Sequence, residues 1–266
     1  PNTNYSDDRT SQNYFTLSAG LGGGIGRMEK VSDLWQTYYI LEKLREQKAL
    51  ARQLEEKDIF EFASFASRLK NKRFFDFRLQ KIAELHALDS LLHKQGLIKD
   101  TDISYFTTLN DYWSFANFRY RESGRILKFW LSPEYSKQNN KPIAGSAVHS
   151  DKTSLISNIS FNCTKQLNLY WERHFNLLLS NETRINTTGK YYNNYSANFF
   201  GSDLSFGYGF FPDSRTSISG YLGYSGQNLI VLNSSSVIPK QWMNRFYLNL
   251  TGNYYISPQL QITGSF

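Results

Sequence analysis

The chain has 266 residues, a mass of 30.9 kDa and a formal net charge of +7. Aromatic residues make up 16% of it, and a chain this aromatic can bury a core, which excludes intrinsic disorder. Cys163 is the single cysteine, which excludes a fold stabilised by internal disulfides. No apolar run reaches the roughly 18 residues of a membrane-spanning helix, whereas the abundance of Tyr and Phe favours strands.

Residues 1–28 are expected to form a polar loop and a first strand. Residues 1–13 are rich in Asn, Ser and Asp, and from Tyr14 to Gly26 the sequence alternates with a period of two, which is typical of a strand. The glycines between 20 and 26 lack the Lys-Ser/Thr ending of a phosphate-binding loop. We expect them to let the strand bend or to leave space opposite a bulky side chain.

Residues 29–123 predict a compact all-α unit. Apolar residues recur at helical spacing in four stretches, which begin at Ser32 as a cap, after Asp58, near Lys72, and at Thr101 or Asp102. The third stretch is expected to end at the glycine of position 96. The fourth stretch is also compatible with a strand, because Tyr, Trp and Phe are frequent in it.

Residues 124–266 alternate again, and the pattern predicts a transmembrane antiparallel β-barrel. The polar positions hold Asn, Ser, Thr, Gln and Gly rather than Lys and Glu, and aromatic residues gather at the strand ends, as in a barrel with a polar lumen and aromatic girdles. Strands in lipid must close on themselves, because unpaired backbone groups are costly there. A soluble antiparallel sandwich or barrel is the alternative. The residues predicted to face lipid are Leu204, Phe206, Phe210, Phe246, Leu248, Leu250, Leu260 and Ile262.

Turn lengths predict the orientation of the strands. Tight turns are expected at Cys163–Gln166, Pro212–Arg215 and Ser257–Gln259, on the periplasmic side, and long extracellular loops at 133–152, 181–190 and 227–240. The helical unit then lies in the periplasm. If residues 104–118 formed a strand instead, the unit would be extracellular.

The same assignment places both chain ends on the outer side. We interpret this as at least one missing strand at each end. This chain then contains about eight or more strands, and the intact barrel contains about ten or more. Against this, Phe266 preceded by Ile262 and Leu260 resembles a closing strand.

Charge is distributed unevenly along the chain. The helical unit holds 16 Lys/Arg and 15 Asp/Glu, so the positive excess lies in the strands and loops. Basic loops are expected to contact lipopolysaccharide phosphates or to bias a lumen toward anions, whereas no Lys/Arg stripe or RNA-binding motif predicts nucleic-acid binding. The densest basic cluster is a candidate docking surface for a partner, or else a solvated helix face balanced by Asp76 and Glu84. It consists of Arg68, Lys70, Lys72, Arg73 and Arg78.

Residues suited to catalysis or metal binding are scarce. His86 and His93 share one predicted helix and have no Cys nearby, so neither a metal site nor a cofactor is expected. His149-Ser150-Asp151 are adjacent, so their side chains point apart and do not form a catalytic relay. The chain is therefore not expected to be an enzyme; a lipid-modifying barrel enzyme that uses His149 or His174 is the remote alternative. Arg173 interrupts an apolar face, which predicts a bulge or a position at the membrane interface.

Three segments resemble a group of poorly characterised outer-membrane proteins from the Bacteroides–Flavobacterium branch of bacteria. They are KNKRFFD at 70–76 followed by Arg78, LDSL at 88–91, and the strand-to-helix junction GIGRMEKV at 24–31. The group has β-barrels with a helical insertion, and the resemblance covers about residues 14–120. It implies an outer-membrane location in a Gram-negative bacterium and no established activity, so no functional residues are carried over.

Two hypotheses of function follow. The first is a structural or accessory barrel whose periplasmic helical unit docks another envelope protein in an export or assembly complex, because the aromatic content of the unit provides a recognition surface. The second is a porin-like channel or transporter in which the helical unit is a plug or gate. The expected partners are outer-membrane lipid, lipopolysaccharide and other envelope proteins.

Overall fold

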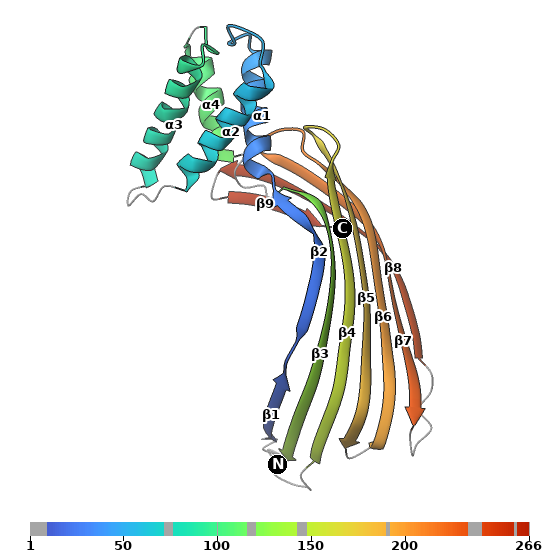
Figure 1. Ribbon diagram of the computed structural model, residues 1–266. Helices are drawn as coiled ribbons and strands as arrows, with labels where there is room; N and C mark the ends of the chain where they lie inside the picture. Colours follow the sequence, from blue (N-terminus) through green and yellow to red (C-terminus); the bar gives the residue numbers. More distant parts are fainter. Residues whose placement is uncertain are drawn as a thin grey trace, which may run out of the picture.

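The computed structural model describes residues 10–71, 77–99, 101–115, 121–142, 148–189, 192–233, 241–257 and 260–265. Within these residues the chain forms nine strands and four helices (Figure 1). The strands are β1 (Thr10–Ser18), β2 (Leu21–Lys30), β3 (Glu122–Pro142), β4 (Val148–Gln166), β5 (Trp171–Gly189), β6 (Tyr192–Phe210), β7 (Thr216–Asn233), β8 (Gln241–Ser257) and β9 (Leu260–Ser265). The helices α1 (Ser32–Glu46), α2 (Glu56–Lys70), α3 (Phe77–Lys94) and α4 (Ile103–Phe115) form a unit inserted between β2 and β3.

All strands belong to one antiparallel sheet with the order β1-β3-β4-β5-β6-β7-β8-β9. β2 follows β1 along the same edge of β3. Among the described residues β9 pairs with β8 alone, so the sheet is open and a closed barrel is not shown. The helices lie together at one end of the sheet, and β1 begins at the other (Figure 1). No described helix has both the length and the apolar character needed to cross a membrane.

The first predicted strand and the predicted loops require correction. Residues 14–26 belong to two strands, separated at Ala19, whose N–H donates to the carbonyl oxygen of Pro133 at 3.3 Å. The first of these strands already begins at Thr10, within the predicted polar loop. The expected long loops at 133–152 and 181–190 are wrong for most of their length, because β3, β4 and β5 extend into them. Of the expected loop at 227–240, residues 227–233 belong to β7, and residues 234–240 lie outside the described residues. Polar composition suggested loops there, but backbone pairing with the neighbouring strand decides strand length, and composition does not reveal it.

Of the predicted tight turns, one is confirmed, one lies further along the chain than expected, and one is only partly described. Cys163–Gln166 is part of β4, and the tight turn follows it, where Asn168 Oδ1 accepts the Trp171 N–H at 2.9 Å. The turn at Pro212–Arg215 is confirmed, and Asp213 Oδ1 accepts the Thr216 N–H there at 2.7 Å. Of Ser257–Gln259, residues 258 and 259 lie outside the described residues.

The four predicted helices are confirmed, including the fourth, although their caps differ in part. Ser32 is the first residue of α1 and not its cap, and α2 begins before Asp58, which forms a capping box with Glu55. Asp102 caps α4 by accepting the Tyr105 N–H at 2.8 Å. Gly96 ends α3 with φ +62°, as predicted.

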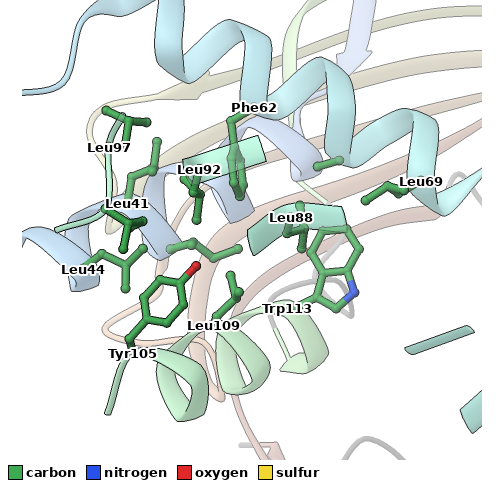
Figure 2. Close-up of a cluster of buried hydrophobic side chains, with 13 residues drawn as sticks. Leu41, Leu44, Phe62, Leu69, Leu88, Leu92, Leu97, Tyr105, Leu109 and Trp113 are labelled. Atoms are coloured by element: carbon green, nitrogen blue, oxygen red, sulfur yellow. The ribbon is translucent and has the colours of Figure 1, made fainter. Parts of the chain in front are cut away.

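The helical unit has its own hydrophobic core, to which all four helices contribute (Figure 2). The core residues are Ile40, Leu41, Leu44, Phe62, Ala66, Leu69, Leu88, Leu92, Leu97, Ile98, Tyr105, Leu109 and Trp113. The Tyr105 hydroxyl donates to Asp89 Oδ1 at 2.8 Å, which satisfies the polar end of a buried ring. The unit is therefore a packed body and not a loose insertion.

Two glycines shape the paired ends of β2 and β3, where the chain enters and leaves the helical unit. Gly26 has φ +111° and Gly124 has φ +135°, a region that side chains other than glycine rarely adopt. We expect Gly26→Ala to lower the free energy of unfolding by about 1–3 kcal/mol, because the new Cβ is strained and would meet the Arg125 carbonyl oxygen. Thermal unfolding followed by circular dichroism measures the loss. Gly252→Ala is the control, since a Cβ there meets no atom within 4 Å; equal losses in both variants would contradict the prediction.

Candidate functional site

The sheet has one apolar and one polar face. Cross-strand partners place the residues predicted to face lipid on β6 and β8, together with Ile262 of β9, on the same face, and Leu260 lies two residues from Ile262 on β9, beside a register shift. On this apolar face Leu204 is 39% and Phe246 is 78% exposed, whereas Ser160 and Ser205 on the polar face are each 8% exposed. Large hydrophobic side chains are therefore exposed and small polar ones are covered by their neighbours, the reverse of the usual arrangement in a water-soluble sheet.

Arg121, just before β3, joins the helical unit to the sheet. Its side chain is 2% exposed, and its Nε lies 3.1 Å from Glu172 Oε2. Nη1 donates to the Leu169 carbonyl oxygen at 3.0 Å. The guanidinium carbon lies 4.5 Å from the ring centre of Trp35 in α1 and 4.4 Å from that of Phe211. Burial lowers the pKa of Arg121, and the charge of Glu172 opposes this effect.

Glu172 links Arg121 to polar side chains on the polar face of β4 and β5. Gln166 Nε2 donates to Glu172 Oε2 at 2.9 Å, and His174 Nε2 lies 2.8 Å from Glu172 Oε1. His174 Nδ1 in turn lies 3.2 Å from the Thr164 hydroxyl. Hydroxyl, imidazole and carboxylate are thus aligned as in a catalytic relay. However, Thr164 is 8% exposed and Glu172 is bound by Arg121 and Gln166, so we assign these residues to the attachment of the helices.

Two further contacts attach the helical unit at the turns. The Tyr39 hydroxyl of α1 lies 3.0 Å from the Leu169 carbonyl oxygen and 2.7 Å from that of Phe211. Arg215, in the β6–β7 turn, forms an ion pair with Asp111 of α4. We call Tyr39, Arg121, Gln166, Glu172 and Phe211 the junction cluster. It fixes the helices to the turn end of the sheet, beside the polar face.

The predicted basic cluster is only partly available to a partner. Arg68 is exposed, but Lys70 is half-buried and its Nζ lies 2.6 Å from Asp33 Oδ1 of α1. Lys72 and Arg73 lie outside the described residues, as does the side chain of Arg78. Lys70 therefore holds α2 to α1.

This pair predicts a loss of stability in acid. Burial raises the pKa of Asp33, but the hydrogen bond and charge of Lys70 outweigh burial, so the pKa lies below its ordinary value. The stabilisation is present above the unfolded-state pKa and is lost as the pH falls through the lowered folded-state pKa, that is, below about pH 4. We expect the thermal midpoint of the helical signal at 222 nm to fall from pH 5 to pH 3, and Asp33→Asn to reduce that fall. An unchanged fall in Asp33→Asn would contradict the prediction.

The far half of the polar face holds a neutral group of charged residues beside a cavity. Lys152 Nζ lies 3.2 Å from Glu134 Oε1 and 2.8 Å from Glu182 Oε1. Arg184 Nε also contacts Glu182, at 3.1 Å, and its guanidinium lies 3.8 Å from the Phe199 ring centre. The cavity has a volume of about 390 Å³ and is lined mainly from β5 to β8. The four charges cancel, so this group lends no support to an anion-selective lumen.

The remaining histidine candidates are described only in part. The side chain of His149 lies outside the described residues. His93 Nε2 lies 3.4 Å from Asp89 Oδ1 on the same helix. In the part of the chain that the structure describes, no three His, Cys, Asp or Glu residues are grouped as metal ligands.

The bulge expected at Arg173 is not found. β4 and β5 pair without interruption from Gln166↔Glu172 to Ser154↔Arg184, and the register shift lies at the far end, between Thr153 and Ser154. Arg173 therefore points to the apolar face, opposite Lys165.

Sequence reasoning missed the junction cluster. Arg121 lies near the predicted boundary between residues 29–123 and 124–266, and Glu172 directly precedes Arg173, the residue that interrupts the apolar pattern. The available signal was a charged residue at the start of each of two strands, Arg121 before β3 and Glu172 in β5. This signal does not reveal that the two residues contact each other. Comparison of the chain with known protein families, curated proteins and solved structures gives no match, so the proposals below rest on geometry.

Proposed function

We propose that the chain is an integral outer-membrane β-barrel protein of a Gram-negative bacterium. In this proposal its periplasmic helical unit docks another envelope protein as part of an export or assembly complex. The observation that carries the membrane proposal is the broad face of exposed hydrophobic side chains, backed by a face of small polar ones. Lipid is the environment in which such a face is stable. The open edges at β1–β2 and β8–β9 would have to be closed by further strand pairing.

Aromatic residues on the apolar face support the same proposal. Next to the helical unit, Trp171 lies 4.5 Å from Phe210 and 6.5 Å from Tyr208, measured between ring centres. At the far end Trp242 is 70% exposed. Amphipathic rings at both borders of an apolar band are typical of membrane interfaces.

The docking role is supported by the surface of the helical unit. Ile103 is 84% and Phe106 is 45% exposed, and they lie one turn apart on α4. Phe60 on α2 and Ile82 on α3 are each 55% exposed. Because the helices pack around a core of their own, this surface is preorganised for a partner.

The junction cluster itself favours the second candidate, a channel with a plug. Arg121 reaches Glu172 and Gln166 on the polar face, at the end of the strands. If the sheet closes around that face, the helical unit stands at the mouth of the lumen. A plug held by one buried ion pair is then the alternative role of the same unit.

The membrane proposal is tested by spin labels along β8. In a Cys163→Ser background, single cysteines are placed at positions 245 to 250 and the labelled chain is reconstituted in lipid vesicles. We expect labels at 246, 248 and 250 to be relaxed by oxygen, which enriches in lipid, and labels at 245, 247 and 249 by a water-soluble nickel complex. Equal access of the nickel complex to all six positions would overturn the proposal.

The docking role is tested against the plug by two measurements. A photo-crosslinking amino acid at Ile103 or Phe106 is expected to capture one defined envelope protein in intact cells, whereas Lys94, exposed on α3, serves as the control position. Single-channel recording of the purified chain separates the alternatives. Steady currents that rise in Arg121→Met, without a crosslinked partner, would favour the plug over docking.

A further inference from the structure

Four basic side chains border the apolar face at its end next to the helical unit. Arg27, Arg125, Lys165 and Arg173 lie there on the adjacent strands β2, β3, β4 and β5, and we call them the basic rim. Arg27 pairs with Glu29 at 2.7 Å. The other three are exposed, and none has a hydrogen bond or ion pair with any described residue.

The pairing of the rim places like charges opposite each other. Arg27 is the cross-strand partner of Arg125, and Lys165 is the partner of Arg173. Like charges directly opposed in a sheet are destabilising. With Glu29 as the acidic residue beside them, the rim has a net charge of +3, which an external anion would neutralise.

The surroundings of the rim define the class of that anion. Phe175 and Leu177 follow Arg173 along the same face of β5, and Leu127 and Phe129 follow Arg125 on β3. Trp171 lies two residues from Arg173 on the same face and marks the interfacial level. A ligand in this position meets guanidinium groups, which suit phosphate oxygens, and an apolar surface directly beyond them.

We propose that the basic rim binds the phosphate of an anionic phospholipid in the leaflet next to the helical unit. The headgroup contacts Arg125, Lys165 and Arg173, and the acyl chains lie along the apolar face. This inference rests on the proposed membrane location. The basic rim lies at the end of the strands next to the helical unit, which in the proposed orientation is the periplasmic side. The phosphate is therefore expected to belong to a phospholipid of that leaflet, and not to lipopolysaccharide bound by extracellular loops.

The test uses Trp171 as a reporter in the full chain, with Trp242→Phe removing the tryptophan at the far end of the apolar face. The chain is reconstituted in vesicles of phosphatidylcholine and phosphatidylglycerol, with bromine on the acyl chains of one lipid at a time. We expect brominated phosphatidylglycerol to quench more strongly, with a relative affinity about three- to tenfold above that of phosphatidylcholine. Arg125→Gln and Arg173→Gln are expected to bring that ratio close to one, and Arg245→Gln, on the polar face, to leave it unchanged.

The outcomes separate this inference from the proposed function. If the two brominated lipids quench equally in the chain with an intact basic rim, the lipid-binding inference is overturned and the proposed membrane location stands. Absence of quenching by either lipid overturns the membrane location as well. Loss of preference in Arg245→Gln would show that overall charge and not the rim is responsible, and stronger competition by lipopolysaccharide than by phosphatidylglycerol would overturn the choice of leaflet. Circular dichroism of each variant confirms that it is folded.

Discussion

Arg121→Met is expected to lower the free energy of unfolding by about 3–5 kcal/mol, because it leaves the buried Glu172 carboxylate without its charged partner. The variant also loses the donor to the Leu169 carbonyl oxygen and the stacking on Trp35 and Phe211. Chemical denaturation, followed by the helical signal at 222 nm, measures the change. Hydrogen exchange is expected to become faster at the start of α1 and in the turn at 167–170.

Three controls separate the charge of Arg121 from its shape. Arg121→Lys keeps the charge but loses the planar fork, so we expect it to be intermediate. Glu172→Gln added to Arg121→Met is expected to recover part of the stability, because it removes the unpaired charge. Arg68→Met removes an exposed arginine of the same unit and is expected to have little effect. A loss in Arg121→Met no larger than that in Arg68→Met would contradict the role of the junction cluster.

The second large effect is expected from a charge on the apolar face at mid-strand. Leu248 lies near the centre of β8, on the apolar face and 63% exposed. We expect Leu248→Lys to lower the free energy of unfolding of the vesicle-inserted chain by about 2–4 kcal/mol, because an ammonium group in the middle of the hydrocarbon layer is costly. Urea titration of vesicle-bound protein measures the loss.

Asn249→Lys is the matched control, because Asn249 is the next residue of β8 and lies on the polar face at the same depth. Its effect is expected to stay within about 0.5 kcal/mol, as for an exposed polar position. If the two variants lose the same stability, the two faces of the sheet do not differ in environment. The membrane proposal would then fail while the observed fold would stand.

How much of this protein the sequence predicts depends on how local the signal is. The helices and their order were predicted well, because apolar residues at helical spacing and a cap such as Asp102 act within a few residues of each other. The two faces of the strands were also predicted, since alternation is a property of each strand alone. Strand ends were not. The polar stretch after Pro133 suggested a loop, but it pairs with β4 through Asn140↔Val148.

The alternating pattern of its residues thus determined which side chains of this protein share a face and where the helical unit is inserted. Only the tertiary structure decided how that unit is attached. Arg121 and Glu172 are 51 positions apart, and their contact depends on the turn at 167–170 meeting the start of α1. The same holds for the basic rim, whose members come from four strands and become neighbours only when the register of the sheet is set. The sequence around a residue does not reveal its cross-strand partner, because the pairing energy is spread over all the residue pairs of two strands.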